Sequence, residues 1–185
     1  MYCPKCECDN ESEVRIVSET YPVKGEDITI EAQVRFCRCC GNDIWDEELD
    51  SKNLKKAFGE YSRKHGLLQP EEIRSIREKY GISQVVFARI LGFGDKTITR
   101  YENGSIPDAT HNNLIYLVGS PQIFSDLLNM RQNAITDIEY ATAVKGLKKL
   151  MPTVSYKSRA IYAMDSEIDI RYSISQPKWE VRNHA

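Results

Sequence analysis

Cysteine side chains are the most distinctive chemical groups in this 185-residue sequence. Cys3 and Cys6 form one C-x-x-C pair, and Cys37 and Cys40 form a second pair that is followed directly by Gly41. Zinc prefers a tetrahedral set of four thiolates, and two short turns from separate parts of a chain can supply that set. The spacing therefore predicts one structural zinc ion per chain, bound by these four cysteines.

A redox dithiol and a pair of disulfides are the competing interpretations of the same cysteines. A thioredoxin-like motif needs a βαβ context, which residues 7–36 do not offer. With four ligands the zinc site is closed, so no open position remains for catalysis. Cys8 and Cys39 are left over, and we expect both to be free thiols near the surface.

The segment between the two cysteine pairs, residues 7–36, has the pattern of a β-hairpin. Apolar and polar residues alternate on both sides of residues 23–27, which carry turn chemistry. So small a sheet buries too little apolar surface to fold alone, and zinc binding would supply the missing free energy, on the order of 10 kcal/mol. We therefore expect residues 1–45 to form a zinc ribbon.

Residues 46–69 are expected to form a linker helix that ends near Gly66. Acidic residues lie near its start and basic residues near its end, which suits the helix dipole. The sequence leaves open whether this helix packs on the ribbon or spans to the next domain.

Residues 70–130 divide into five short helices separated by glycine and turn residues. The residues expected to open or cap them are Pro70, Ser83, Asp95, Pro107 and Ser120-Pro121. In the third of these helices Lys96, Thr99 and Arg100 share one face, since they are spaced i, i+3 and i+4. Ile98 and Tyr101 fall on the other face, where they can fill a core.

The stretch from Ile82 to Pro107 resembles the Xre-like helix-turn-helix family in its spacing of Ser83-Gln84, Leu91-Gly92 and Arg100-Tyr101-Glu102-Asn103-Gly104. In that family the third helix lies in the major groove, so the resemblance implies a DNA-binding domain. Long cations on the outer face can reach guanine, and threonines can meet phosphate or a thymine methyl group. The residues expected to contact DNA are Gln84, Lys96, Thr97, Thr99 and Arg100.

The order of ribbon, linker helix and Xre-like domain resembles the MqsA antitoxin family over about residues 1–130. The carrying segments are residues 1–6, Phe36-Cys37 to Cys40, and Gly92 to Gly104. The resemblance implies a homodimer that represses its own operon at a palindromic operator, and a zinc-bound ribbon that neutralises a small RNase toxin. Arg100 matches the family's base-reading arginine, whereas Lys96 replaces an asparagine of the family, so a different operator sequence is expected.

Residues 131–185 have no counterpart in this resemblance, and their role is open. We expect a helix over residues 133–151, and a β-hairpin between residues 154 and 175. That hairpin could pack on the preceding helix or on a partner. The expected fold class is thus α+β: a small zinc ribbon, an all-α helix-turn-helix domain and a C-terminal helix and β-hairpin extension.

The composition bounds the function classes. The formal net charge is −2, with a net charge of −4 in residues 1–45 and +3 in residues 131–185. The longest apolar run has five residues, and no apolar signal-peptide core is present, so we expect a cytoplasmic protein without membrane contact. The histidines lie near no evident nucleophile, which favours a non-enzymatic antitoxin and repressor. The alternatives are a stand-alone regulator without a toxin and, last, a thiol oxidoreductase.

Overall fold

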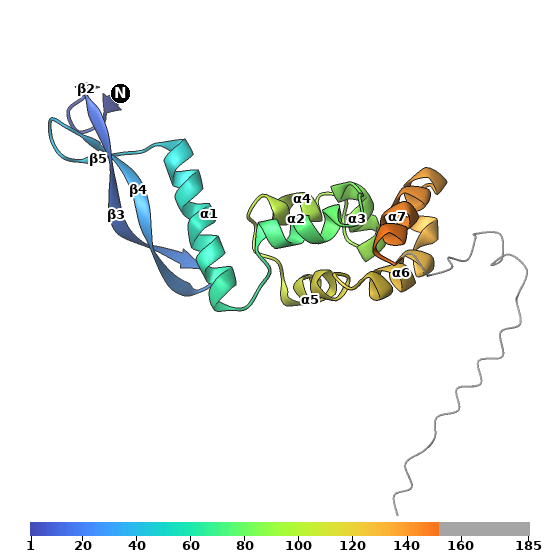
Figure 1. The fold of residues 1–185 in the computed structure, drawn as a ribbon. Coiled ribbons are helices and arrows are strands. Elements are labelled where there is room, and N and C mark those ends of the chain that lie inside the picture. The colour runs from blue at the N-terminus through green and yellow to red at the C-terminus, as the bar shows by residue number, and fades with distance from the viewer. Residues whose placement is uncertain (152–185) are drawn as a thin grey trace, which may run out of the picture. The chain divides into compact units, whose positions relative to one another are not determined.

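The computed structural model describes residues 1–151 of the chain, and the fold of these residues is α+β (Figure 1). Five strands come first and helices follow. The strands are β1 (Tyr2–Cys3), β2 (Cys8–Asp9), β3 (Ser12–Val23), β4 (Glu26–Cys37) and β5 (Asp43–Ile44). The helices are α1 (Glu47–Lys64), α2 (Pro70–Glu78), α3 (Gln84–Leu91), α4 (Thr97–Glu102), α5 (Ala109–Leu117), α6 (Pro121–Met130), the 3-10 helix η1 (Gln132–Ala134) and α7 (Asp137–Leu150).

The predicted hairpin is the long antiparallel pair of β3 and β4. Its register runs without a break from Ser12 opposite Cys37 to Val23 opposite Glu26. The two strands are joined at Lys24 and Gly25, which both have positive φ, as the tight turns of two-residue hairpins require. Strand β5 pairs with the end of β4, so the strand order of this sheet is β3-β4-β5, and β1 and β2 form a separate two-stranded sheet.

Helix α1 packs on one face of this hairpin, which resolves the alternative that the sequence left open (Figure 1). Ala57 of α1 is fully buried among Ile28, Ile30 and Ala32 of β4. The buried Asn53 adds a polar clip, since its side chain accepts a hydrogen bond from the Gln33 backbone N–H and donates one to the Gln33 carbonyl oxygen. The ribbon therefore gains a helical cover beyond its metal site.

The start of α1 is fixed by an aspartate. The Asp46 carboxylate accepts hydrogen bonds from the backbone N–H groups of Glu48 and Leu49, which caps the helix. The same carboxylate accepts a hydrogen bond of 2.8 Å from Arg35 Nε of β4. The Arg35 side chain and these backbone groups hold the pKa of Asp46 below its ordinary value. Helix and sheet are thus joined at the point where the ribbon ends.

Helices α2 to α7 share a core built around Tyr80. Its ring is stacked on Phe124 with 3.8 Å between ring centroids, and its hydroxyl donates to the carbonyl oxygen of Val118. Ile98 and Tyr101 of α4 are buried, as predicted. In α5 the buried residues are Asn112 and Ile115, whereas the apolar Leu117 is about half exposed.

Two helix starts differ from the prediction. Helix α4 begins after Lys96 and has no side-chain cap, because the predicted cap Asp95 instead forms an ion pair with Arg89. Helix α5 begins at Ala109, where Asp108 accepts a hydrogen bond from the His111 backbone N–H and acts as the cap in place of a start at Pro107. In both places a local hydrogen bond overrides the turn signal of the sequence.

Helix α7 begins at Asp137 rather than at residue 133, because Thr136 and Glu139 form a capping box and residues 132–134 form η1. Gly146 of α7 lies so close to the Tyr80 backbone that an added Cβ would be 2.1 Å from its carbonyl oxygen. Only glycine permits this approach. The hairpin predicted between residues 154 and 175 lies outside the described residues.

Candidate metal centre and nucleic-acid interface

Two turns bring the four predicted ligands together. Cys3 and Cys6 lie at the β1–β2 turn, and Cys37 and Cys40 lie at the turn that follows β4. Each turn is closed by a backbone hydrogen bond to the carbonyl oxygen of its first cysteine, from Glu7 to Cys3 and from Gly41 to Cys37. Because the two turns are held in separate hairpins, the strand pairing itself places the thiols.

The distances between the sulfur atoms fit a zinc ion. All four Sγ atoms lie within 4.8 Å of one another. Cys3 Sγ is 3.6 Å from Cys40 Sγ, and Cys6 Sγ is 3.9 Å from Cys37 Sγ. Four ligands at a Zn–S distance of about 2.3 Å in a tetrahedron are about 3.8 Å apart, whereas a disulfide needs about 2 Å. All six cysteines are free, so Cys3, Cys6, Cys37 and Cys40 form the zinc site of this chain.

The surroundings of the thiols favour anion formation at one of them. The backbone N–H groups of Cys40 and Cys39 lower the pKa of Cys37 to about 7. Hydrogen bonding to Cys40 and burial raise the pKa of Cys6, since the same sulfurs crowd each other. A divalent cation relieves this crowding, because it holds all four sulfurs as thiolates. Cys8 and Cys39 are exposed, as predicted for free surface thiols.

The face of α4 that the sequence assigned to DNA is open to solvent. Lys96 and Arg100 are exposed, and neither forms an ion pair with a carboxylate among the described residues. Thr99 is half-buried, while Thr97 is only 6% exposed. The two cations are thus available to a ligand, whereas the Thr97 side chain belongs to the packing of the helix against its neighbours.

A buried carboxylate links α4 to α2 and α3. The Glu102 side chain is fully buried and accepts hydrogen bonds from Arg77 Nε at 2.6 Å and Nη2 at 2.9 Å. Gln84 Nε2 donates to Glu102 at 2.8 Å, and the Thr99 hydroxyl donates to Gln84 Oε1 at 2.8 Å. Burial opposes ionisation of Glu102, but the bonds from Arg77 and Gln84 outweigh it and hold its pKa below the ordinary value.

This network brings two of the predicted DNA-contacting residues, Gln84 and Thr99, into contact with each other. Sequence reasoning did not find the central role of Glu102. Its position beside the buried Tyr101 was the available signal, because a charge on an inward-facing position needs a partner.

A second ion pair, between Arg89 of α3 and Asp95, fixes the turn before α4 with bonds of 3.0 and 2.8 Å.

The turn between α3 and α4 depends on Gly92. This residue caps α3 with a φ of 77°, in the left-handed region, and its N–H group bonds back to the helix. Any other residue would be strained there, since a Cβ is unfavourable at positive φ. The turn therefore sets the direction in which α4 leaves α3.

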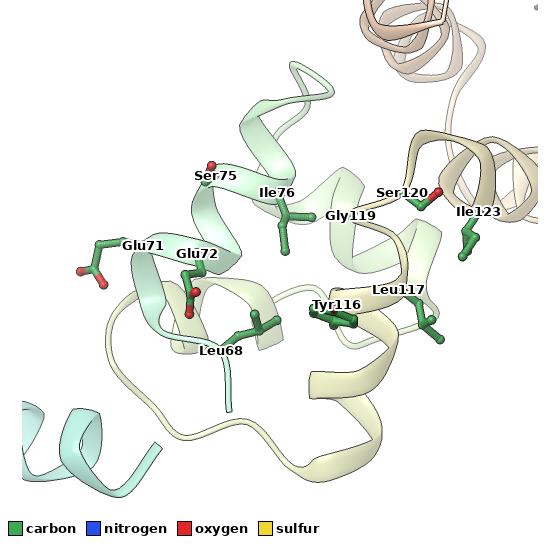
Figure 2. A pocket seen from close by; sticks show the side chains of 10 residues that line it. All are labelled: Leu68, Glu71, Glu72, Ser75, Ile76, Tyr116, Leu117, Gly119, Ser120 and Ile123. Atoms are coloured by element: carbon green, nitrogen blue, oxygen red, sulfur yellow. The ribbon is translucent and has the colours of Figure 1, made fainter. Parts of the chain in front are cut away.

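An apolar hollow lies between α2, α5 and α6 (Figure 2). Leu68, Ile76, Tyr116 and Leu117 supply most of its apolar side chains. Its lining holds two carboxylates and two serines but neither a histidine nor a cysteine.

The described histidines are used locally. His65 Nε2 lies 2.8 Å from a carboxylate oxygen of Glu26, and His111 contacts Asp108 and the Tyr101 hydroxyl. Neither contact involves a cysteine or serine nucleophile. None of the described helices is long and apolar enough to cross a membrane.

A tetrathiolate ribbon followed by a helix-turn-helix body defines the class of metal-stabilised DNA-binding regulators. Comparison with known families identifies the member of this class. The family described as the antitoxin component of a bacterial toxin-antitoxin system, MqsA, matches residues 1–130, and the chain belongs to that family. At the level of the family, this match points to an antitoxin that binds DNA. A search of curated proteins found no match.

Proposed function

We propose that this chain is the antitoxin of a type II toxin-antitoxin pair and represses its own operon by sequence-specific DNA binding. The observation that carries the DNA-binding part is the exposed pair Lys96 and Arg100 on a helix whose other side is locked to the body by Glu102. A rigid helix with unpaired long cations is suited to reading base edges in a major groove.

The proposed division of contacts follows from burial and hydrogen bonding. Arg100 and Lys96 would read guanine, and Thr99 would meet a phosphate or a thymine methyl group. The NH₂ group of Gln84 has two hydrogens. One is donated to Glu102, and the other would be donated to a phosphate. Thr97, being buried, is left with a packing role at the start of α4.

We propose further that the chain acts as a homodimer on a palindromic operator. Helix α4 has only six residues and can span only a few base pairs, so two copies are needed for a specific site. The half-sites would then lie about 34 Å apart, one turn of B-DNA. Light scattering of the purified chain should give twice the mass of one chain.

The N-terminal module is proposed to neutralise a small RNase-type toxin. Residues 1–45 carry nine acidic and five basic residues, and the tetrathiolate zinc site adds a formal charge of about −2. A protein that binds RNA must be cationic, so an acidic cover is complementary to it. The proposal is non-enzymatic, in keeping with the description of the family as an antitoxin component.

The DNA-binding part is tested by Arg100→Ala in a binding titration with the promoter fragment upstream of the gene. Loss of one bidentate base contact should weaken binding about 5- to 150-fold, equivalent to about 1–3 kcal/mol. Arg63→Ala, which removes an exposed arginine of α1, is the matched control and should leave binding unchanged. Equal binding by wild type and the Arg100 variant would refute the assignment of α4 as the reading helix.

A stand-alone regulator is the second candidate, and α7 is the observation that favours it. This helix lies beyond the residues that the family model matches, and it is built into the core through Gly146 and Leu147. Co-expression with the adjacent gene separates the two candidates. Rescue of growth supports the antitoxin, whereas a harmless neighbour product supports the stand-alone regulator.

A further inference from the structure

The β3–β4 hairpin has two unlike faces. Residues paired across the strands point to the same side, so alternate pairs form each face. Helix α1 covers the face that holds Ile28, Ile30 and Ala32. We call the opposite side the outer face; it is formed by Val14, Ile16, Ser18, Thr20 and Pro22 of β3 and by Asp27, Thr29, Glu31, Gln33 and Arg35 of β4.

The outer face exposes apolar side chains, which are unfavourable in contact with water. Ile16 is 66% exposed and Val14 is 44% exposed, two positions apart on the same strand. Strand β3 is also at the edge of its sheet, and its open edge has no pairing strand in residues 1–151. A long edge strand that carries exposed β-branched residues associates readily with other chains, and proteins normally blunt it with charges or cover it.

Two of the three charged residues of the outer face, Asp27 and Glu31, are acidic, and the third is Arg35. Glu31 and Asp27 form no ion pair among the described residues, and Lys56 reaches the carbonyl oxygen of Glu31 rather than its carboxylate. The arginines nearby are already paired with carboxylates, whereas Lys56 has no carboxylate partner among the described residues. Arg35 is paired with Asp46, Arg15 with Glu13, and Arg38 with Glu11 and Glu13.

We propose that the outer face is the surface on which the chain binds its toxin, with Ile16 and Val14 as the apolar anchor and Glu31 as a charge contact. The occupant is a basic protein surface that offers an apolar patch beside lysine or arginine side chains. This inference rests on the proposed antitoxin function and adds the location of the interface. The carboxylates of the outer face would repel the phosphates of a nucleic acid, which disfavours nucleic acid as the occupant. They would also repel the same carboxylates on a second copy of the chain, which disfavours self-association.

The anchor arm of the test uses Val14→Thr together with Ile16→Thr. Both changes keep a β-branched residue on an exposed strand, so the hairpin and its zinc content should be unchanged. The probe is the purified small basic protein encoded beside the gene. Its dissociation constant should rise at least tenfold, chiefly through faster dissociation. Leu54→Gln is the matched control, because it removes an apolar side chain of α1 that is 42% exposed, and it should not change the affinity.

The charge arm compares Glu31→Lys with Asp126→Lys. Both raise the net charge by two, but Asp126 is an exposed residue of α6 in the helical region. Glu31→Lys should lower the association rate severalfold at low salt and less at high salt, whereas Asp126→Lys should have a much smaller effect.

The outcomes distinguish failure of the interface location from failure of the antitoxin function. Unchanged affinity of the Val14/Ile16 variant, or equal effects of the two lysine variants, would overturn the location while the antitoxin function stands. A wild-type chain that fails to bind the probe at all would overturn the antitoxin function itself. If the anchor variant changes only self-association of the free chain, the outer face is an interface between copies and the inference is wrong.

Discussion

Neutralising Glu102 is the sharpest test of how the reading helix is held. The change Glu102→Gln keeps the shape of the side chain but removes its charge. Arg77, whose side chain is only 12% exposed, then loses its buried ionic partner and keeps only the exposed Glu78 carboxylate. The expected result is a less stable helical region with a looser α4.

The magnitude follows from the surroundings of the pair. Removal of one partner of a buried ion pair costs about 3–5 kcal/mol, because the other charge stays buried without compensation. Arg77 keeps some compensation here, since Nη1 donates to the Ile82 carbonyl oxygen at 3.0 Å and Nη2 lies 3.3 Å from the exposed Glu78 carboxylate. We therefore expect a loss of about 2–4 kcal/mol, which corresponds to a fall in Tm of about 10–20 °C for a region of this size.

Urea unfolding of the zinc-loaded chain measures this loss, and a double-mutant cycle isolates the pair. Arg77→Met alone should cost a similar amount. The double variant Arg77→Met with Glu102→Gln should cost clearly less than the sum, because it leaves no buried charge unpaired. A single Glu102→Gln cost below about 0.5 kcal/mol, or additive single costs, would show that the pair does not hold α4.

Three further changes have equally definite outcomes. Cys37→Ser should abolish stoichiometric zinc, measured by atomic emission, and remove the β-hairpin signal from circular dichroism while the helical signal largely persists. Gly146→Ala should destabilise the chain in urea by about 1–3 kcal/mol, although alanine is the better helix former, because its Cβ would meet the Tyr80 carbonyl oxygen at 2.1 Å; a stabilised variant would refute the close approach. The stability difference between wild type and Glu102→Gln should be constant above about pH 4.5 and shrink as the pH falls below it. The sign follows because the folded-state pKa of Glu102 is lowered, so its contribution is lost on protonation; a difference that grows in acid would contradict this sign.

The sequence was most informative where chemistry depends on spacing alone. Two C-x-x-C pairs and an alternating segment between them predicted the ligands and the hairpin, because strand pairing leaves little freedom once both ends are tied to one ion. The separation of Lys96 and Arg100 from Ile98 and Tyr101 also followed from helical periodicity. The structure confirms that Ile98 and Tyr101 are buried.

Other features could not be predicted because they depend on contacts between different elements of the fold. Thr97 shares its residue type with Thr99, but packing buries one and leaves the other half-exposed. Asp95 has the composition of a helix cap, yet Arg89 one helix earlier competes for its carboxylate and wins two hydrogen bonds. The folded structure decides which partner lies within hydrogen-bond distance of a side chain, and the local sequence pattern does not specify that partner.

By itself, then, the order of residues determined the metal ligands, the type of most elements and the family, since these depend on short-range spacing and periodicity. The tertiary structure decided which groups meet across elements. These are the ion pair of Glu102 with Arg77 that holds α4, the contact of Gly146 with the Tyr80 backbone that positions α7, and the outer face of the hairpin that α1 does not cover. The physical reason is that burial and electrostatic pairing are properties of three-dimensional proximity, which forms only when distant segments fold together.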